Sequence, residues 1–215
     1  MFGRFAALRE LSAEFQSGRL YAIFGENGAG KSTLLRIIAG LSKPTRGQVA
    51  FDSAAEASDA QNVGYMAHAS MLYEELNSME NLRYFGGLRG VTGATQLQDL
   101  LRRVGLDPNL GRRVGDYSQG MRQRLSLARA VVHDPAVLLL DEPFSNLDAA
   151  SAQDLARLLG EMRSAGKCVL VVTHQPRLLE DVADESLLLA QGRIAARGLG
   201  INAAAVQPQA RETSW

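Results

Sequence analysis

The sequence predicts an α/β fold with a mostly parallel sheet flanked by helices, and three observations support this. The apolar run 20–24 leads into a glycine-rich loop and then into an apolar helical run, 34–41. The run 137–140 is apolar throughout, as expected for a parallel strand that is covered on both faces. A third apolar run, 168–172, follows a helical pattern at 151–163, so strands and helices alternate along the chain.

The remaining strands are expected to be short. Gln191-Gly192 has the composition of a tight turn between two apolar segments, which predicts a hairpin. Proline and glycine at 44–47 predict another turn. In chain order, the segments expected to be extended are 2–15, 48–51, 62–66, 186–190 and 193–197.

The helices are identified by apolar spacing and by their caps. Asn77 and Glu80 have the spacing of a capping box. Ser118 has the composition of an N-cap, and Asp134-Pro135 stops the helix that it would open. In chain order, the expected helices are 77–88, 96–104, 121–133, 151–163 and a short one at 176–183.

This order predicts one domain, 1–215, with a helical insertion. Residues 1–71 and 125–198 would form the core lobe, residues 72–124 a helical subdomain, and residues 199–215 a loose tail.

Composition excludes several classes of function. Lys+Arg and Asp+Glu both number 23, so the basic excess of a nonspecific nucleic-acid binder is missing. The single cysteine, Cys168, excludes an internal disulfide and fits a reducing compartment. No apolar run approaches the ~18 residues of a membrane span, so work at a membrane would require a partner.

The glycine-rich loop fits the phosphate-binding pattern Gly-x4-Gly-Lys-Ser/Thr. Its glycines let consecutive N–H groups point inward, and the helix that follows adds its positive dipole end. Lys31 supplies a positive charge for the outer phosphates, and Ser32 offers a hydroxyl to Mg²⁺. The alternative is a chance glycine-rich turn. The predicted ATP-binding residues here are Gly25, Glu26, Asn27, Gly28, Ala29, Gly30, Lys31, Ser32 and Thr33.

Two acids follow the apolar run 137–140, at the carboxyl edge where open α/β sheets bind ligands. Asp141 suits the surroundings of Mg²⁺, and Glu142 suits the polarisation of a water that attacks the γ-phosphate. The alternative is an acidic strand end facing solvent. His174 follows the next core strand, so it would reach the same edge and orient that water; alternatively it is structural. His133 is instead expected to interact with a helix C-terminus.

A second anion-seeking helix start lies at Ser118, Gln119 and Gly120, without a lysine. Two such starts and one nucleotide predict a head-to-tail dimer, in which each ATP touches Lys31 of one copy and Ser118 of the other.

With these motifs in order, the sequence resembles the nucleotide-binding domain of ABC transporters over almost its whole length. Residues 25–33 are similar to the Walker A loop, 138–142 to Walker B, and 117–121 to the signature. The resemblance also implies a D-loop at 145–148, ending in Asp148, and assigns His174 as the switch histidine. Phe2 would stack on adenine. The implied fold is a P-loop NTPase core with a small antiparallel β part and an inserted helical subdomain.

Three departures from the family pattern stand out. The chain starts almost at Phe2, so either the sheet lacks its N-terminal edge strand or the start codon is misassigned. His68 occupies the position where the family usually has the Q-loop glutamine, where it would sense the partner and the Mg²⁺. The signature has Gln119 and Met121 in place of glycine and glutamine.

His68, the compact length and Thr173-His174-Gln175-Pro176 resemble the haem-exporter ATP-binding subunit of cytochrome c maturation. The resemblance implies an ATPase that uses ATP and Mg²⁺, with catalytic Lys31, Glu142 and His174 and with Mg²⁺ near Ser32, Asp141 and His68. It would sit on the cytoplasmic face of the cell membrane through an integral membrane subunit. The alternatives are another ABC exporter (drug, lipid or polysaccharide), a P-loop small-molecule kinase, or a regulatory ABC protein.

Overall fold

The computed structural model describes residues 6–51 and 62–201. Within these residues six strands form one mixed sheet, in the order β2-β3-β4-β1-β5-β6. The first five strands in this order run parallel, and β6 pairs antiparallel with β5. The strands are β1 (Leu20–Phe24), β2 (Val63–Met66), β3 (Val137–Asp141), β4 (Cys168–Val172), β5 (Glu185–Ala190) and β6 (Arg193–Leu199). The predicted α/β class with a small antiparallel part is confirmed.

Alternate residues of β1 pack into two separate apolar cores, one on each face of the sheet. Leu20, Ala22 and Phe24 belong to the core that also contains α4 and α5 side chains. Tyr21 and Ile23 pack with α1 on the other face. The sheet is therefore covered on both sides, which explains why its central strands are apolar at every position.

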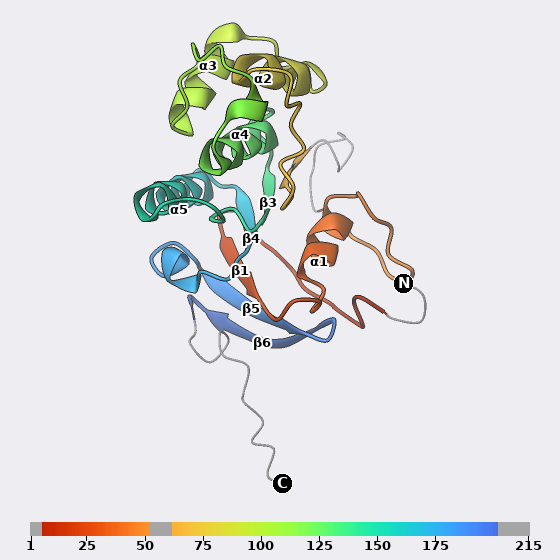
Figure 1. Ribbon diagram of the computed structural model, residues 1–215. Coiled ribbons are helices and arrows are strands. Elements are labelled where there is room, and N and C mark those ends of the chain that lie inside the picture. The colour runs from red at the N-terminus through yellow and green to blue at the C-terminus, as the bar shows by residue number, and fades with distance from the viewer. Residues whose placement is uncertain (1–5, 52–61, 202–215) are drawn as a thin grey trace.

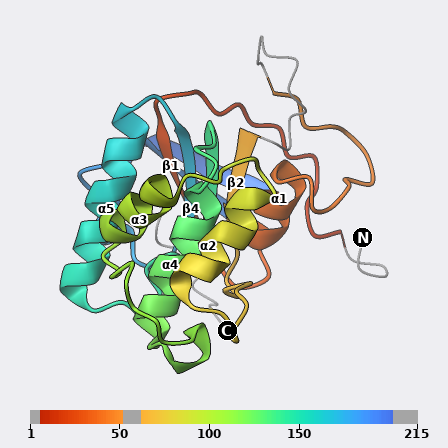
Figure 2. The ribbon, with the colours of Figure 1, turned by 90° about the horizontal axis from the view of Figure 1, so that it is seen from above.

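The helices occupy distinct places around the sheet. Helices α1 (Lys31–Ile38) and α5 (Ala149–Ser164) flank its two faces, and three others gather beyond one end of it (Figure 1). Those three are α2 (Ser78–Gly87), α3 (Ala94–Arg103) and α4 (Gln119–Val131). Figure 2 shows them from above, with α4 over the strands and between α2 and α5. Helix α4 thus joins the helical group to the sheet.

The contact between α4 and the sheet depends on one glycine. A Cβ atom on Gly64, in β2, would lie 2.3 Å from the carbonyl oxygen of Ala130 in α4. Since no side chain fits there, the helix backbone can approach the strand closely.

The predicted caps of α2 and α4 are present, but α3, α4 and α5 begin at Ala94, Gln119 and Ala149, each two residues before its predicted start. Asn77 and Glu80 form the capping box of α2, and Ser118 caps α4 by accepting from the Met121 N–H at 3.2 Å. Helix α5 begins at Ala149, two residues before the predicted start, because Asp148 caps it by accepting from the Ser151 N–H at 2.9 Å.

Three other predictions differ from the structure. Residues 48–51 form no strand and pair with none of the described strands; residues 48–50 lie exposed, and Phe51 is half-buried against the core that contains Tyr21. The expected helix at 176–183 is only a short 3-10 turn, Pro176–Leu179. Residues 6–15, within the segment predicted to be extended, run without strand pairing, although Arg9 N–H donates to the Gly192 carbonyl at 2.8 Å. A strand needs a partner, and apolar spacing alone does not supply one.

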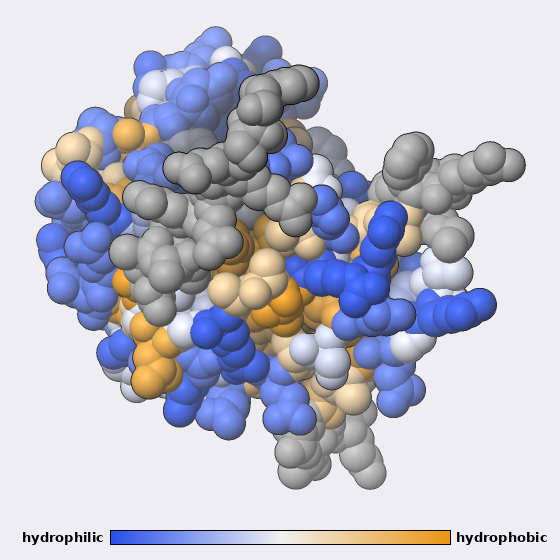
Figure 3. Space-filling model, turned by 90° about the horizontal axis from the view of Figure 1, so that it is seen from below, coloured by the Kyte–Doolittle hydropathy of each residue, from blue (hydrophilic) through white to orange (hydrophobic). Residues whose placement is uncertain are grey.

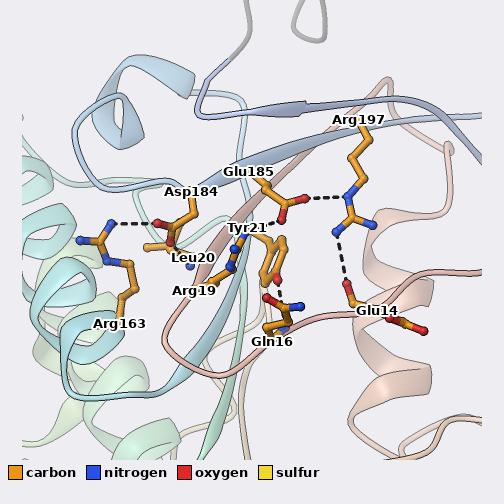
Figure 4. A network of polar contacts seen from close by, with 9 residues as sticks. All are labelled: Glu14, Gln16, Arg19, Leu20, Tyr21, Arg163, Asp184, Glu185 and Arg197. Carbon is orange, nitrogen blue, oxygen red and sulfur yellow. Dashed lines mark hydrogen bonds and ion pairs between the residues drawn. The ribbon is translucent and has the colours of Figure 1, made fainter.

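A polar network fastens the β5–β6 hairpin to β1 (Figure 4). The Glu185 carboxylate, little exposed, accepts from Arg197 Nε at 2.6 Å and from Arg19 Nη1 at 2.9 Å. Arg197 holds the pKa of Glu185 below its ordinary value, and Arg19 contributes. Beside it, the Asp184 carboxylate accepts from the Leu20 N–H at 2.7 Å. The network therefore joins β1, β5 and β6 at the end away from the glycine-rich loop.

Seen from below, the hairpin side of the molecule shows apolar residues in its middle and hydrophilic residues around them (Figure 3). Leu199 of β6 is 82% exposed. None of the helices in the described part of the chain is both long and apolar enough to cross a membrane.

Candidate nucleotide-binding site

The glycine-rich loop links β1 to α1 and depends on backbone conformations that favour glycine. Gly25, Gly28 and Gly30 have φ values of 142°, 82° and 104°. A Cβ on Gly25 would lie 2.2 Å from the carbonyl oxygen of Leu189 in β5. The loop therefore rests directly on the backbone of a neighbouring strand, and its shape is set by main-chain contacts.

Lys31 is the first residue of α1, and its ammonium lies inside the loop. Nζ donates to the carbonyl of Gly25 at 2.6 Å and to that of Glu26 at 3.0 Å, and the residue is buried. No side chain among the described residues caps α1, whose N-cap is Gly30. The positive helix end and the lysine thus face the same loop, which is the arrangement that a phosphate chain requires.

Two glycines far apart in the sequence, Gly30 in the loop and Gly192 in the β5–β6 turn, meet the same backbone carbonyl. A Cβ on Gly30 would lie 2.6 Å from the carbonyl oxygen of Ala7, and a Cβ on Gly192 would lie 2.7 Å from that same oxygen. The Gly192 N–H also donates to the Ala29 carbonyl at 3.1 Å. The β5–β6 turn, the N-terminal segment and the loop therefore meet backbone to backbone.

The two predicted acids lie at the end of β3. Asp141 closes the strand and is buried, and Glu142 follows it with a φ of 55°. The Glu142 N–H donates to the Val172 carbonyl at 2.9 Å, which ties it to the end of β4. This unusual backbone conformation for a non-glycine residue aims the side chain away from the strand direction.

His174 meets Glu142 at this edge. The ring atom Nε2 of His174 lies 3.4 Å from Glu142 Oε1, and the backbone N–H of His174 donates to Glu142 Oε2 at 3.3 Å. Burial raises the pKa of Glu142, and the neighbouring His174 lowers it to a smaller extent. Oε1 is buried, makes no hydrogen bond with the described residues, and has His174 Nε2 as its ion-pair contact. A carboxylate beside a histidine that keeps hydrogen-bonding capacity is suited to hold and polarise a water.

The donor set near the loop fits Mg²⁺. Ser32 at the start of α1 and Asp141 at the end of β3 both offer oxygen, and α1 packs against β3. In residues 6–51 and 62–201, no group of three His, Cys, Asp or Glu side chains could hold a metal alone. Two protein oxygens, completed by phosphate and water, match the way Mg²⁺ binds. His68 is exposed just after β2, and its imidazole suits Mg²⁺ poorly.

The predicted signature residues lie at the start of α4. Ser118 and Gln119 are exposed, and Gly120 packs close to the Asn146 carbonyl, 3.4 Å from where its Cβ would be. The helix start therefore adjoins the loop that follows Glu142. Phe2 lies outside the described residues.

A family model described as ABC transporter matches residues 8–145. The chain belongs to the ABC transporter family. This ABC cassette is 34% identical over 200 residues to the ABC transporter ATP-binding protein NatA of Bacillus subtilis, covering 89% of this chain and 81% of NatA. It is 37% identical over 209 residues to the sulfate/thiosulfate import ATP-binding protein CysA of Mesorhizobium japonicum, covering 90% of this chain and 59% of CysA.

Solved structures agree on the fold of the cassette. The ATP-binding subunit of an ABC transporter aligns with a TM-score of 0.82 at 29% identity, covering 92% of this chain and 85% of that one. A dimeric bacterial ABC transporter cassette aligns with a TM-score of 0.84 at 24% identity, covering 93% of each chain. The P-loop NTPase fold and the ATPase prediction are confirmed.

The cassette also contains residues whose contacts the sequence did not reveal. Asp148 caps α5, and the Ser151 side chain and N–H hold its pKa below the ordinary value. Gln123 Nε2 donates to the Glu142 carbonyl at 2.9 Å, and Arg124 bonds Ser151 Oγ. His133 directly follows the C-cap of α4, and its Nε2 lies 3.3 Å from the Val63 carbonyl, so the side chain contacts β2. Helical spacing could place Gln123 and Arg124 on α4, but not against these partners.

Proposed function

We propose that this cassette is the ATPase subunit that powers a separate integral membrane partner from the cytoplasmic face of the membrane. The observation that carries the proposal is the pairing of Glu142 with His174 at the sheet edge that also holds Asp141. The positive charge of Lys31 also lowers the pKa of Glu142, though less than His174 does. Phosphate-binding and water-polarising groups therefore share one site, which is the requirement for hydrolysis.

Each residue then has a chemical role in ATP hydrolysis. The loop N–H groups and Lys31 bind the phosphates, and Ser32 and Asp141 hold Mg²⁺, which neutralises phosphate charge when bound. Glu142 accepts a hydrogen bond from the attacking water and orients it in line with the γ-phosphate. His174, exposed beside it, donates to a γ-phosphate oxygen. Positioning and charge supply most of the catalysis in phosphoryl transfer.

The site is completed by a second copy of the chain in this proposal. The start of α4 exposes Ser118 and offers a positive helix end without a lysine. A head-to-tail dimer brings that helix end onto the ATP held by Lys31 of the other copy. A solved cassette with the same fold is dimeric, which supports dimer formation but not a particular arrangement. ATP-loaded Glu142→Gln protein that stays monomeric at high concentration would remove the dimer from the proposal.

The proposed dock for the membrane partner lies on α2 and the segment before it, within the helical subdomain 72–124. Tyr73 stacks with Phe85, and Tyr84 meets both rings edge-on. Four large apolar residues on this dock or directly beside it are exposed: Met71, Tyr73, Tyr84 and Leu88. An apolar patch of this kind on a cassette matches a cytoplasmic helix of a membrane subunit.

The transported substrate is not part of the proposal. CysA is named for sulfate/thiosulfate import, and NatA only as an ATP-binding protein, so these relatives give haem export no support. The haem prediction depends on His68 and residues 173–176 alone. Identifying what co-purifies with this chain would separate the alternatives. A haem exporter would bring a membrane subunit of cytochrome c maturation, another transporter a different membrane subunit, and a regulatory ABC protein ribosomes.

The experiment that tests the proposal is Glu142→Gln. The substitution keeps shape and removes the carboxylate, so ATP turnover should fall at least ~100-fold while the ATP dissociation constant stays within about 2-fold. Glu180→Gln, an exposed matched control, should keep normal turnover. Turnover at the normal rate in Glu142→Gln would remove Glu142 from its role. Wild-type hydrolysis without any acceptor molecule separates an ATPase from a kinase.

A further inference from the structure

One hydrogen bond joins α4 directly to the backbone of the proposed catalytic carboxylate. Gln123 Nε2 donates to the carbonyl oxygen of Glu142 at 2.9 Å. Gln123 lies just over one helical turn beyond Ser118, which caps the same helix. The helix whose start carries the signature is therefore in contact with the residue that would hold the attacking water.

The backbone of Glu142 requires such support because its φ is 55°. A non-glycine residue in the left-handed region is strained and persists only where the surroundings hold it. Its N–H is held by the Val172 carbonyl at 2.9 Å, and its carbonyl also accepts from the Ser145 N–H at 3.2 Å. Of these contacts, that of Gln123 is the one made by a side chain and by the helical part of the molecule.

The rest of α4 is seated firmly against the same region. Arg124 donates to the Gly105 carbonyl at 3.0 Å and bonds the hydroxyl of Ser151, which in turn donates to Asp148 at 2.6 Å. Gly120 packs against the Asn146 carbonyl. Helix α4 thus adjoins Glu142 and the cap of α5. A shift of the helix would therefore move the backbone of Glu142 through the hydrogen bond from Gln123.

We propose that Gln123 is a positioning residue for ATP hydrolysis: its amide fixes the backbone of Glu142 and so sets the carboxylate in place for the water, in register with α4. The proposal rests on the catalytic role of Glu142 proposed above. Gln123 itself touches neither substrate nor Mg²⁺ in this mechanism. It makes the rate of hydrolysis depend on how α4 sits, and α4 is the helix that a second copy or a membrane partner would move.

The experiment compares two variants of similar length in the full chain. Gln123→Met removes the donor and keeps the volume, while Gln123→Glu places a carboxylate oxygen where the donor nitrogen was. Losing one neutral hydrogen bond and freeing the backbone of Glu142 should lower kcat roughly 5- to 20-fold, with a larger loss in Gln123→Glu. KM for ATP should stay within about 2-fold, since the contact lies away from the phosphate loop.

The split between kcat and KM separates positioning from a merely structural role. A misplaced Glu142 slows hydrolysis and leaves ATP binding unchanged, whereas a general loss of structure would weaken ATP binding as well. Gln153→Met on the exposed side of α5 is the matched control and should leave kcat and KM unchanged.

The outcomes are separable. Normal kcat in both Gln123 variants, or a rise in KM for ATP that matches the fall in kcat, would overturn this proposal while an inactive Glu142→Gln leaves the proposed function intact. Normal kcat in Glu142→Gln would overturn both. If Gln123→Met loses stability, Gln123→Glu, which keeps a polar side chain of the same shape, decides the question by the same two readouts.

Discussion

The cassette has two helix starts that could bind phosphate, and they are built in opposite ways. Helix α1 begins at Gly30 without a side-chain cap, behind three glycines with positive φ and over a buried lysine. Helix α4 begins at Ser118, whose hydroxyl already accepts from its own helix at Met121. The first start leaves its donors for a ligand, whereas the second satisfies one of them internally and lies exposed.

The difference indicates a division of work between the two starts. The α1 loop combines a buried lysine, an uncapped helix end and glycines with positive φ, which suits it to hold a phosphate chain within one copy of the protein. The α4 start has a dipole and a hydroxyl but no cation, so on its own it is a weak anion site. Substitutions at the first should therefore remove nucleotide binding, and substitutions at the second should remove turnover while sparing binding.

The largest effect is expected at Gly25. In Gly25→Ala the new Cβ would meet the Leu189 carbonyl at 2.2 Å, and the φ of 142° is closed to alanine, so the loop must deform. ATP affinity should fall at least ~100-fold, measured by titration calorimetry. Gly40→Ala is the control, because its φ is also positive but its Cβ would meet open space. That variant should cost about 1 kcal/mol in free energy of unfolding and leave ATP affinity unchanged.

The next effect is expected at Lys31. Lys31→Met removes the ammonium that would meet the outer phosphates, and a hydrogen-bonded charge is worth about 1.5–3 kcal/mol. ATP affinity should fall roughly 10- to 100-fold in the same titration. The exposed Lys43→Met variant serves as the control. A normal dissociation constant in Lys31→Met would contradict the assignment of the loop.

Ser118→Ala addresses the other helix start. Loss of the cap should lower the free energy of unfolding by about 1 kcal/mol, measured by urea denaturation. ATP affinity of the single chain should stay within about 2-fold, while steady-state turnover should fall several-fold because the helix start no longer completes the site. Asn77→Ala, which loses the cap of α2, should cost similar stability and keep turnover. Equal turnover losses in both variants would erase the proposed distinction between α1 and α4.

The smallest effect on nucleotide binding is expected at Glu185, whose network fastens the hairpin behind the phosphate loop (Figure 4). Glu185→Gln should lower the free energy of unfolding by about 2 kcal/mol at neutral pH, because it weakens charged hydrogen bonds to a buried carboxylate. The loss is not larger because both arginines are partly exposed to solvent. ATP affinity should stay within about 2-fold and turnover should stay normal, which makes this the smallest effect on the site.

The pH dependence of that loss follows from the pKa of Glu185, which is below its ordinary value of 4.5 in the folded chain. Stability from a lowered pKa is fully present above the unfolded value and disappears as pH falls through the folded one. The difference between wild type and Glu185→Gln should therefore vanish toward acid pH, measured by urea denaturation at several pH values. A constant difference would mean that the charge of Glu185 is not the cause.

What the sequence could predict depended on how local the signal was. The phosphate loop, the caps at Asn77 and Ser118, and the Gln191-Gly192 turn are written in adjacent residues, and the structure has all of them. The strand expected at 48–51 is absent because extended propensity does not supply a partner strand. Apolar spacing predicts the start of α5 two residues too late. Asp148, which the resemblance assigns to the D-loop, is also the cap of this helix.

The site shows the same limit. The order of strands brings Asp141, Glu142 and His174 to one edge, which the apolar runs before them predicted. The contact from Gln123 to the Glu142 carbonyl depends on how α4 crosses the sheet, and Gly64 lets it approach. No short motif encodes a crossing of that kind.

The carbonyl oxygen of Ala7 lies close to both Gly30 and Gly192, and this limits which substitutions the gene can accept. At Gly30 the Leu8 side chain also stands in the way, but the Ala7 carbonyl obstructs both glycines. Every amino acid at position 7 carries that carbonyl, so no replacement there can make room. A saturation library selected for ATPase activity should therefore be depleted of every substitution at Gly192, although it lies far along the chain from Gly30. Recombination with related genes would have to exchange both segments together with the segment around Ala7.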